Sequence, residues 1–194
     1  GSQFSLQNFD LSSPHGAIQF SGNGDADNVT VVGQGALPLD LLRMVVPGLE
    51  TMDGTANIAI AAYGPKEVRN ATVDVSLAAT AMKHDSFPAP FEDVRSSFQA
   101  THDKISIKKL TASLGGGTVK GSGSIATKNW VPTRFDLKMA SEDTEVQWVD
   151  YLPPAIGDAA LTFNGPVDAL LLAGDVTINE MTFVDRIDWE DWVV

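Results

Sequence analysis

The chain has 194 residues, a formal net charge of −12 at pH 7 and a sequence pI of about 4.4. This acidic balance argues against a nucleic-acid-binding surface, which needs clustered Lys and Arg, so no nucleic-acid partner is expected. The absence of cysteine excludes disulfides and thiolate metal sites. The sequence contains no run of about 18 apolar residues, so no segment is predicted to span a membrane as a helix.

Most of the chain alternates between apolar and polar residues, which is the period of a β-strand with two unlike faces. The cleanest example is 133–140, where Phe135, Leu137 and Met139 share one parity and charged residues take the other. The segments 3–22 and 105–125 each read as strand, turn, strand. Further strands are predicted at residues 29–32, interrupted by Gly33 and Gly35, and at residues 55–62, 71–81, 95–101, 159–163 and 169–178.

Two short segments favour helix. Residues 39–46 carry apolar side chains at helical spacing and end at Pro47-Gly48. Residues 141–152 have Ser141 or Asp143 as a possible N-cap and acidic residues in the first turn. Residues 83–103 are the least regular part, and two prolines within 86–94 predict a connection or an edge segment there.

The segment 105–125 contains a slip in its alternation at Lys108-Lys109, which predicts a β-bulge. The same slip occurs 101 residues earlier, at Gln7-Asn8. A repeated register slip is harder to produce by chance than repeated hydrophobicity. We therefore expect two units of about 100 residues, each with about six short strands and one short helix, stacked edge to edge in one long curved sheet.

The predicted division follows from this period. Residues 1–2 resemble an expression scar, 3–90 form the first β-repeat, 91–184 form the second, and 185–194 are an acidic, aromatic tail. The chain has no Met start and no signal peptide, so we expect a fragment of a longer protein.

The order of the second unit resembles the TamB family, which belongs with the AsmA-like proteins of the bacterial envelope. The resemblance rests on 105–110, 115–123, 132–137, 157–163, Gly165-Pro166 and 174–178. It implies an all-β fold with short helices, arranged as a long U-shaped, taco-like sheet with an apolar groove. It also implies a periplasmic location in a Gram-negative bacterium, with the parent protein anchored in the inner membrane. We expect neither that anchor nor the family's C-terminal domain within this chain.

The resemblance further implies a non-enzymatic role in carrying phospholipid between the two membranes, with acyl chains as partners and an outer-membrane barrel protein contacted through the parent. No cofactor is expected. The residues that would line the groove share the apolar faces of the predicted strands. They are Phe4, Leu6, Ile58, Ile60, Val73, Val75, Leu77, Ile105, Ile107, Val119, Ile125, Phe135, Leu137, Met139, Leu161, Phe163, Leu172, Val176 and Ile178.

Two other functions stay open. A curved sheet could bind an unfolded outer-membrane strand by edge pairing. A closed β-sandwich, as in an adhesin or a carbohydrate-binding domain, would bury the same apolar faces against a second sheet. Periodicity alone does not distinguish a groove from a sandwich.

Catalytic and metal-binding patterns are not found. His15, His84 and His102 have no ligand spacing and are interpreted as ordinary surface residues. The glycines 115–117 are not followed by the Lys and helix of a phosphate loop. Asn23, Asp25 and Asp27 are spaced like calcium ligands but lack the later Gly and Glu, so a solvated turn is predicted. The acidic residues within 185–191 are interpreted as a solvated end that could meet a basic partner.

Overall fold

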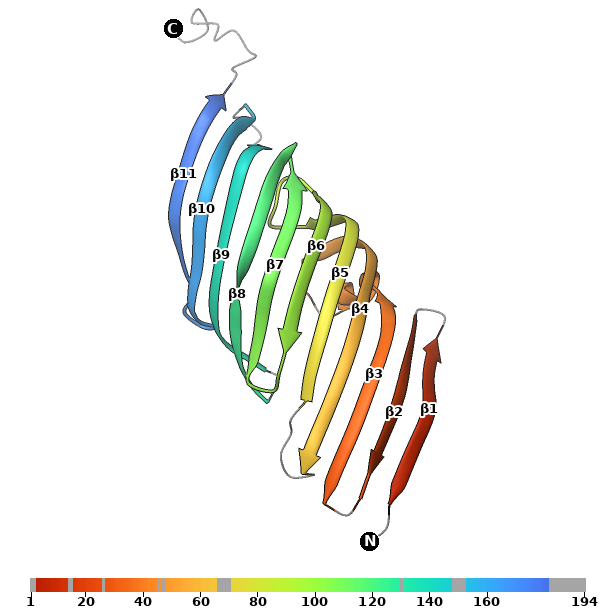
Figure 1. The fold of residues 1–194 in the computed structure, drawn as a ribbon. Coiled ribbons are helices and arrows are strands. Elements are labelled where there is room, and N and C mark those ends of the chain that lie inside the picture. The colour runs from red at the N-terminus through yellow and green to blue at the C-terminus, as the bar shows by residue number, and fades with distance from the viewer. Residues whose placement is uncertain are drawn as a thin grey trace, which may run out of the picture.

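One antiparallel sheet of eleven strands contains most of the chain in the computed structural model (Figure 1). The strand order in the sheet is the order in the sequence, so every strand pairs with its sequence neighbours. Strands make up 81% of the residues that the structure describes, which confirms the all-β prediction. The structure describes residues 3–13, 16–25, 27–44, 46, 48–65, 71–129, 131–147 and 153–181.

The elements follow one another with short connections. They are β1 (Phe4–Ser13), β2 (Gly16–Gly24), β3 (Asn28–Pro38), the 3₁₀ helix η1 (Leu39–Met44), β4 (Leu49–Pro65), β5 (Ala71–His84), β6 (Phe91–Ala100), β7 (Lys104–Leu114), β8 (Gly117–Lys128), β9 (Val131–Val146), β10 (Ala155–Pro166) and β11 (Leu171–Met181).

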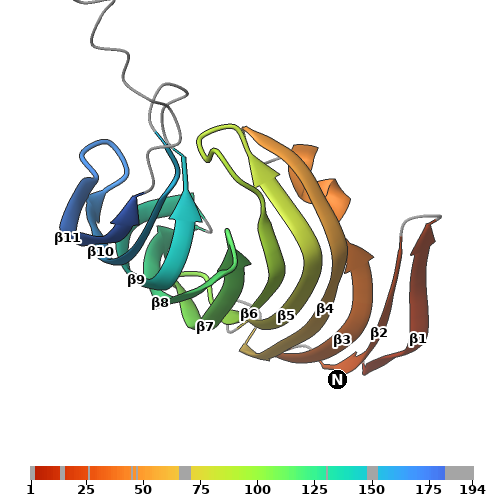
Figure 2. The same ribbon diagram turned by 90° about the horizontal axis from the view of Figure 1, so that it is seen from above.

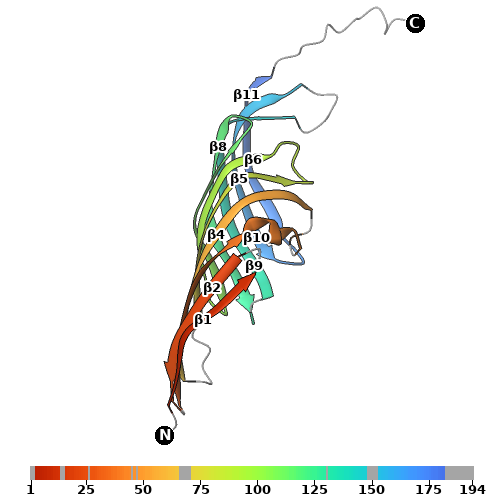
Figure 3. The same ribbon diagram turned by 90° about the vertical axis from the view of Figure 1, so that its right-hand side faces the viewer.

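The sheet curves into an open trough, and η1 lies on the side toward which it curves (Figures 2 and 3). The described residues form a single sheet, with no second sheet facing it. The closed β-sandwich is therefore wrong as a description of this part of the chain. The apolar face of the sheet is therefore not covered by a second sheet.

Both predicted bulges are present. The pairing of β7 with β8 shifts between Ile107 and Leu110, and the pairing of β1 with β2 shifts between Leu6 and Phe9. In each case the two intervening residues leave the regular ladder. The bulge keeps the apolar residues before and after it on the same face of the sheet.

The predicted interruption at Gly33 and Gly35 is wrong, because β3 runs through both glycines. Gly33 pairs with Phe20 on β2. A Cβ at Gly33 would lie 2.7 Å from the Phe20 ring, so the glycine leaves room for the aromatic side chain. A glycine can mark a close approach within a strand as well as its end.

The predicted helix over 141–152 is also wrong for the residues that the structure describes, since 141–146 form the end of β9. This segment pairs with β8 and β10 on its two sides. The acidic residues of the segment are exposed, and Glu142 lies 3.4 Å from Lys120 on β8. The acidic pattern therefore belongs to a polar sheet face, whereas 148–152 lie outside the described residues.

The helix predicted at 39–46 and the irregular segment 83–103 differ from the prediction in their type and in their limits. Residues 39–44 form a 3₁₀ helix, and its deepest residue is Leu39, which is 2% exposed. The prolines within 86–94 lie in the β5–β6 connection, as predicted. The strand expected at 95–101 instead begins at Phe91, and β6 is a central strand between β5 and β7.

Strand limits recur with the predicted period at several places. β7 begins 100 residues after β1 (104 − 4), β8 begins 101 residues after β2 (117 − 16), and β11 begins 100 residues after β5 (171 − 71). The division into repeats at residues 90 and 91 stays a prediction, and the tail 185–194 lies outside the described residues.

Gly123 should be required where β8 meets β9. Its φ is +147°, and a Cβ there would collide with the carbonyl oxygen of Asp136. We expect Gly123→Ala to lower the free energy of unfolding by more than about 1 kcal/mol, because alanine is strained at this backbone angle. Urea unfolding measures the effect. Ser122→Ala, on the exposed neighbour, should change it little, and equal stabilities of the two variants would contradict the prediction.

Candidate functional site: the apolar face of the sheet

A single row of side chains crosses the whole sheet on its apolar face. Directly paired residues of antiparallel strands project to the same side, and the pairings connect one residue from every strand. We call this row the central rung. It consists of Leu11, Ile18, Gly35, Ile58, Val75, Phe98, Ile107, Gly123, Leu137, Phe163 and Leu172.

The pairing register puts all nineteen residues predicted from the sequence on this face. Six of them belong to the central rung, and the remainder lie on neighbouring rungs. Their exposure varies across the sheet. Val119 is buried at 3%, the predicted residues of β1 and β11 are exposed, and the others are half-buried. The face is therefore apolar from one lateral edge to the other, and it is most open at the two edges.

Near one end of the strands the apolar face is covered. Leu39 of η1 lies in a buried cluster with Met52, Phe91 and Val94. Phe87 of the β5–β6 connection packs against the same cluster. The sequence pattern does not reveal these covering residues, because a short 3₁₀ helix and a proline-flanked phenylalanine carry no strand periodicity.

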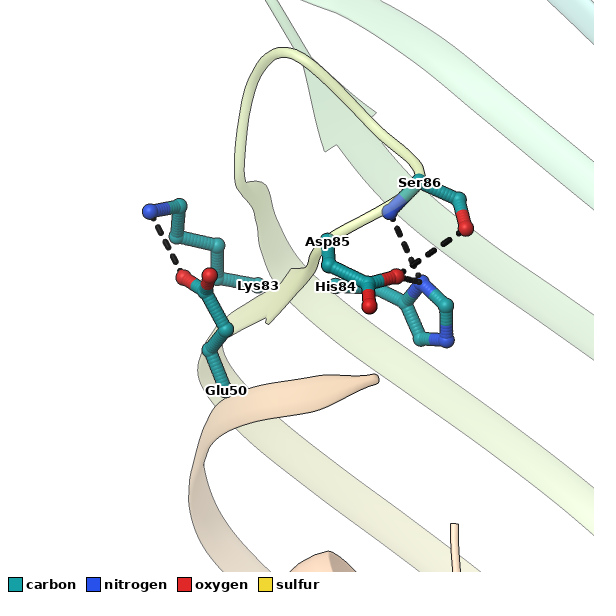
Figure 4. Close-up of polar contacts among 5 residues, drawn as sticks. All are labelled: Glu50, Lys83, His84, Asp85 and Ser86. Atoms are coloured by element: carbon teal, nitrogen blue, oxygen red, sulfur yellow. Dashed lines mark hydrogen bonds and ion pairs between the residues drawn. The ribbon is translucent and has the colours of Figure 1, made fainter. Parts of the chain in front are cut away.

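The β5–β6 connection is held by a local set of polar contacts (Figure 4). The Ser86 amide donates to His84 Nδ1 at 3.1 Å, and the Ser86 hydroxyl donates to Asp85 Oδ1 at 3.0 Å. His84 Nδ1 also lies 3.1 Å from Asp85 Oδ1. On the neighbouring strand ends, Lys83 Nζ lies 2.6 Å from Glu50 Oε2.

Phe87 forms one wall of an apolar cavity of about 230 Å³. Its ring meets the Phe91 ring edge to face, with centroids 5.0 Å apart. The opposite wall comes from β8 to β11, including Val119, Leu161 and Ile178. The cavity is thus bounded by the covering connection on one side and the apolar face of the second half of the sheet on the other.

A family model described as the TamB C-terminal domain matches residues 108–185. The match covers less than half of the chain and supports a TamB-family fragment. The matched segment begins at the second bulge and contains the remainder of β7 and all of β8 to β11. No curated protein and no solved structure matches the chain.

This match supports the resemblance to the TamB family, and it corrects one expectation about the C-terminal domain. The family's C-terminal domain was expected to be absent, but residues 108–185 match the domain of that description. The TamB family is linked to assembly of the bacterial envelope and is not known as enzymatic. No helix among the described residues is long and apolar enough to cross a membrane.

Among the described residues, no three His, Asp or Glu side chains lie close enough together to hold a metal ion. Asp25 Oδ1 accepts the backbone amides of Asp27 and Asn28 at 2.9 and 2.8 Å, which is the geometry of a polar turn. His102 is exposed in the β6–β7 turn. His15 and the acidic residues of 185–191 lie outside the described residues.

Asp158 connects three strands of the TamB segment beside the cavity. Its Oδ1 accepts the Asp143 amide at 2.9 Å and its Oδ2 accepts Asn179 Nδ2 at 3.0 Å. The Asn179 hydrogen bond, followed by the Asp143 amide, lowers the pKa of Asp158 below its usual 3.8. Nearby, the buried Thr144 hydroxyl donates to the Gly157 carbonyl at 3.0 Å.

We expect a pH dependence at this position. Because the pKa of Asp158 is lowered in the folded state, its stabilising effect is present above pH 3.8 and is lost as the pH falls through the folded pKa. The protection factors of the β11 amides near Asn179, corrected for the intrinsic exchange rate, should therefore fall as the pH falls below 3.8. NMR titration of the carboxyl measures the pKa, and Asn179→Ala should raise it toward 3.8. A pKa of 3.8 or higher in the unmodified chain would contradict the prediction.

Proposed function

We propose that the apolar face is a groove for phospholipid acyl chains, and that this segment carries phospholipid between the inner and outer membranes. The role is non-enzymatic. The proposed location is the periplasm of a Gram-negative bacterium, with the parent protein anchored in the inner membrane. An outer-membrane barrel protein is proposed as a partner of the parent.

The observation that carries this proposal is the central rung. It runs across all eleven strands, from β1 to β11, and each of its eleven positions is either apolar or glycine. Ten strand spacings of about 4.8 Å give it a length of roughly 48 Å. A continuous apolar path of this length suits a linear hydrocarbon chain, which requires no specific polar contacts.

The two ends of the central rung are exposed, which supports a groove that is open at both ends and through which an acyl chain could pass. Leu11 on β1 is 55% exposed and Leu172 on β11 is 56% exposed, whereas the middle of the rung is half-buried. Exposed apolar surface of this extent on a soluble chain marks an interaction site.

The cavity beside Phe87 fits the same proposal. Its walls are mostly apolar side chains, and it adjoins the apolar face of β8 to β11. The β5–β6 connection would lie over part of an acyl chain there. The sheet would supply the remaining contact surface.

Native mass spectrometry of the purified chain tests the proposal. We expect masses of one or more phospholipids above that of the protein, removed by mild detergent exchange. A bare protein mass from a bacterial expression host, together with no uptake of added phospholipid, would reject the groove.

Edge pairing with an outer-membrane strand is a second candidate. β1 and β11 each have one edge that no other described strand occupies. An unpaired edge can accept an extended peptide by backbone hydrogen bonds. A strand peptide that crosslinks along β11, in a chain that takes up no phospholipid, would favour this function over the first.

A further inference from the structure

The polar face of the sheet, opposite the groove, contains a hollow of about 320 Å³ over β5, β6 and β7. Its lining includes two cationic residues, Arg95 and Lys109, and three hydroxyl residues, Ser76, Ser97 and Thr111. The amide of Asn57 is also part of the lining. In a chain with a net charge of −12, a hollow with two cations in its wall is an unexpected local feature.

The strand register places these residues side by side. Ser76 pairs with Ser97, and Ser97 pairs with Lys109. Arg95 pairs with Thr111 on the adjacent rung. Arg95 and Lys109 are therefore diagonal neighbours across two strands, a separation of roughly 7–8 Å. This is the spacing of the two positions in the sheet, and like charges on neighbouring positions repel each other.

Neither cation is neutralised within the described part of the chain, where Arg95 and Lys109 form no ion pair and no hydrogen bond. The adjacent Lys108 lies 3.7 Å from Asp74 Oδ1, with both side chains more than half exposed. Such an exposed pair contributes little. The Asp74 carboxylate also accepts Gln99 Nε2 at 3.0 Å, so it is engaged away from Arg95.

The β7 bulge creates this arrangement. In a regular strand, Lys108 and Lys109 would project to opposite faces. The bulge keeps Ile107 and Leu110 on the apolar face, so both lysines lie on the polar face. The matching bulge in β1 also borders a hollow, and it carries the neutral residues Gln7 and Asn8. The two bulges therefore share a geometry, but only the second supplies positive charge.

We propose that the hollow between Arg95 and Lys109 binds a phosphate group, either free or as the phosphodiester of a lipid headgroup. An Arg guanidinium, a Lys ammonium and several hydroxyls can together donate hydrogen bonds to the oxygens of a phosphate group. The site faces away from the groove, so it is independent of acyl-chain binding.

NMR titration of the 194-residue chain in phosphate-free buffer tests the proposal, with the amides of Ser97, Lys109 and Thr111 as reporters. Inorganic phosphate should shift these signals saturably. Deacylated glycerophosphoglycerol, which has a lipid headgroup but no acyl chain, distinguishes the sources. Tighter binding of this compound indicates a headgroup site, and tighter binding of inorganic phosphate indicates a free-phosphate site.

Two variants make the test specific. The double substitution Lys108→Gln and Lys109→Asn reproduces the neutral first bulge and should weaken phosphate binding at least tenfold. Arg95→Gln should do the same if the double variant fails to fold. Lys138→Gln, on the same polar face in β9, should bind like the unmodified chain. Unsaturable shifts, equal affinity in Arg95→Gln, or tighter binding of a hexaglutamate peptide than of phosphate would overturn the proposal.

Discussion

Replacing Leu137 with aspartate should leave the chain folded and remove its bound phospholipid. Leu137 is a half-buried member of the central rung, and it is paired with Gly123 on one side and Phe163 on the other. In an open groove the new carboxylate can stay hydrated, so we expect a loss of only roughly 1–2 kcal/mol in the free energy of unfolding. A charge that faces acyl chains is much more costly, so lipid occupancy should fall sharply.

The control is Lys138→Asp, because Lys138 is exposed on the opposite face of the same strand. It should retain both the fold and the lipid. Urea unfolding measures stability, and lipid extraction with mass spectrometry measures occupancy. Cooperative unfolding of Leu137→Asp under native conditions would show that this position is a closed core, where an unpaired carboxylate costs on the order of 3–5 kcal/mol or more.

The largest loss of stability should come from the covered end of the apolar face. Phe91 is 5% exposed, belongs to the buried cluster and contacts the Phe87 ring. We expect Phe91→Ala to lower the free energy of unfolding by about 3–5 kcal/mol, through lost burial and the cavity that remains. This is a large part of the roughly 5–15 kcal/mol that stabilises a typical domain.

The comparison variant is Leu172→Ala. Leu172 on β11 is 56% exposed, so truncation of its side chain removes little buried apolar surface. We expect a change below about 1 kcal/mol, as for other exposed sites. Urea unfolding of both variants separates a covered zone from an open zone. A loss at Leu172 as large as that at Phe91 would show that the edge of the face is covered as well.

The sheet could be predicted because alternation is a local signal. Each strand carries its own two faces in its own sequence, and the slips at Gln7-Asn8 and Lys108-Lys109 located both bulges without any knowledge of the partners. The local sequence pattern predicted the wrong secondary structure where strand pairing determines the conformation. Residues 141–146 have the acid pattern of a helix start, yet β8 and β10 on either side hold them as a strand.

The covering elements and the polar-face hollow depend on contacts between residues far apart in the sequence. Leu39 and Phe87 meet the apolar face only after β4, β5 and β6 have paired. The approach of Arg95 to Lys109 depends on the shifted register of β6 against β7. Neither arrangement produces a periodic pattern in the sequence, so neither can be predicted from one segment alone.

The most direct measurement of the groove is photo-crosslinking in bacteria that express the chain in the periplasm. A photo-reactive amino acid at Leu137 or Phe163, on the central rung, should crosslink to phospholipid. The same amino acid at Lys138 or Thr162, on the polar face, should not. Crosslinking to phospholipid from both faces, or from neither, would contradict the account of the apolar face as a lipid groove.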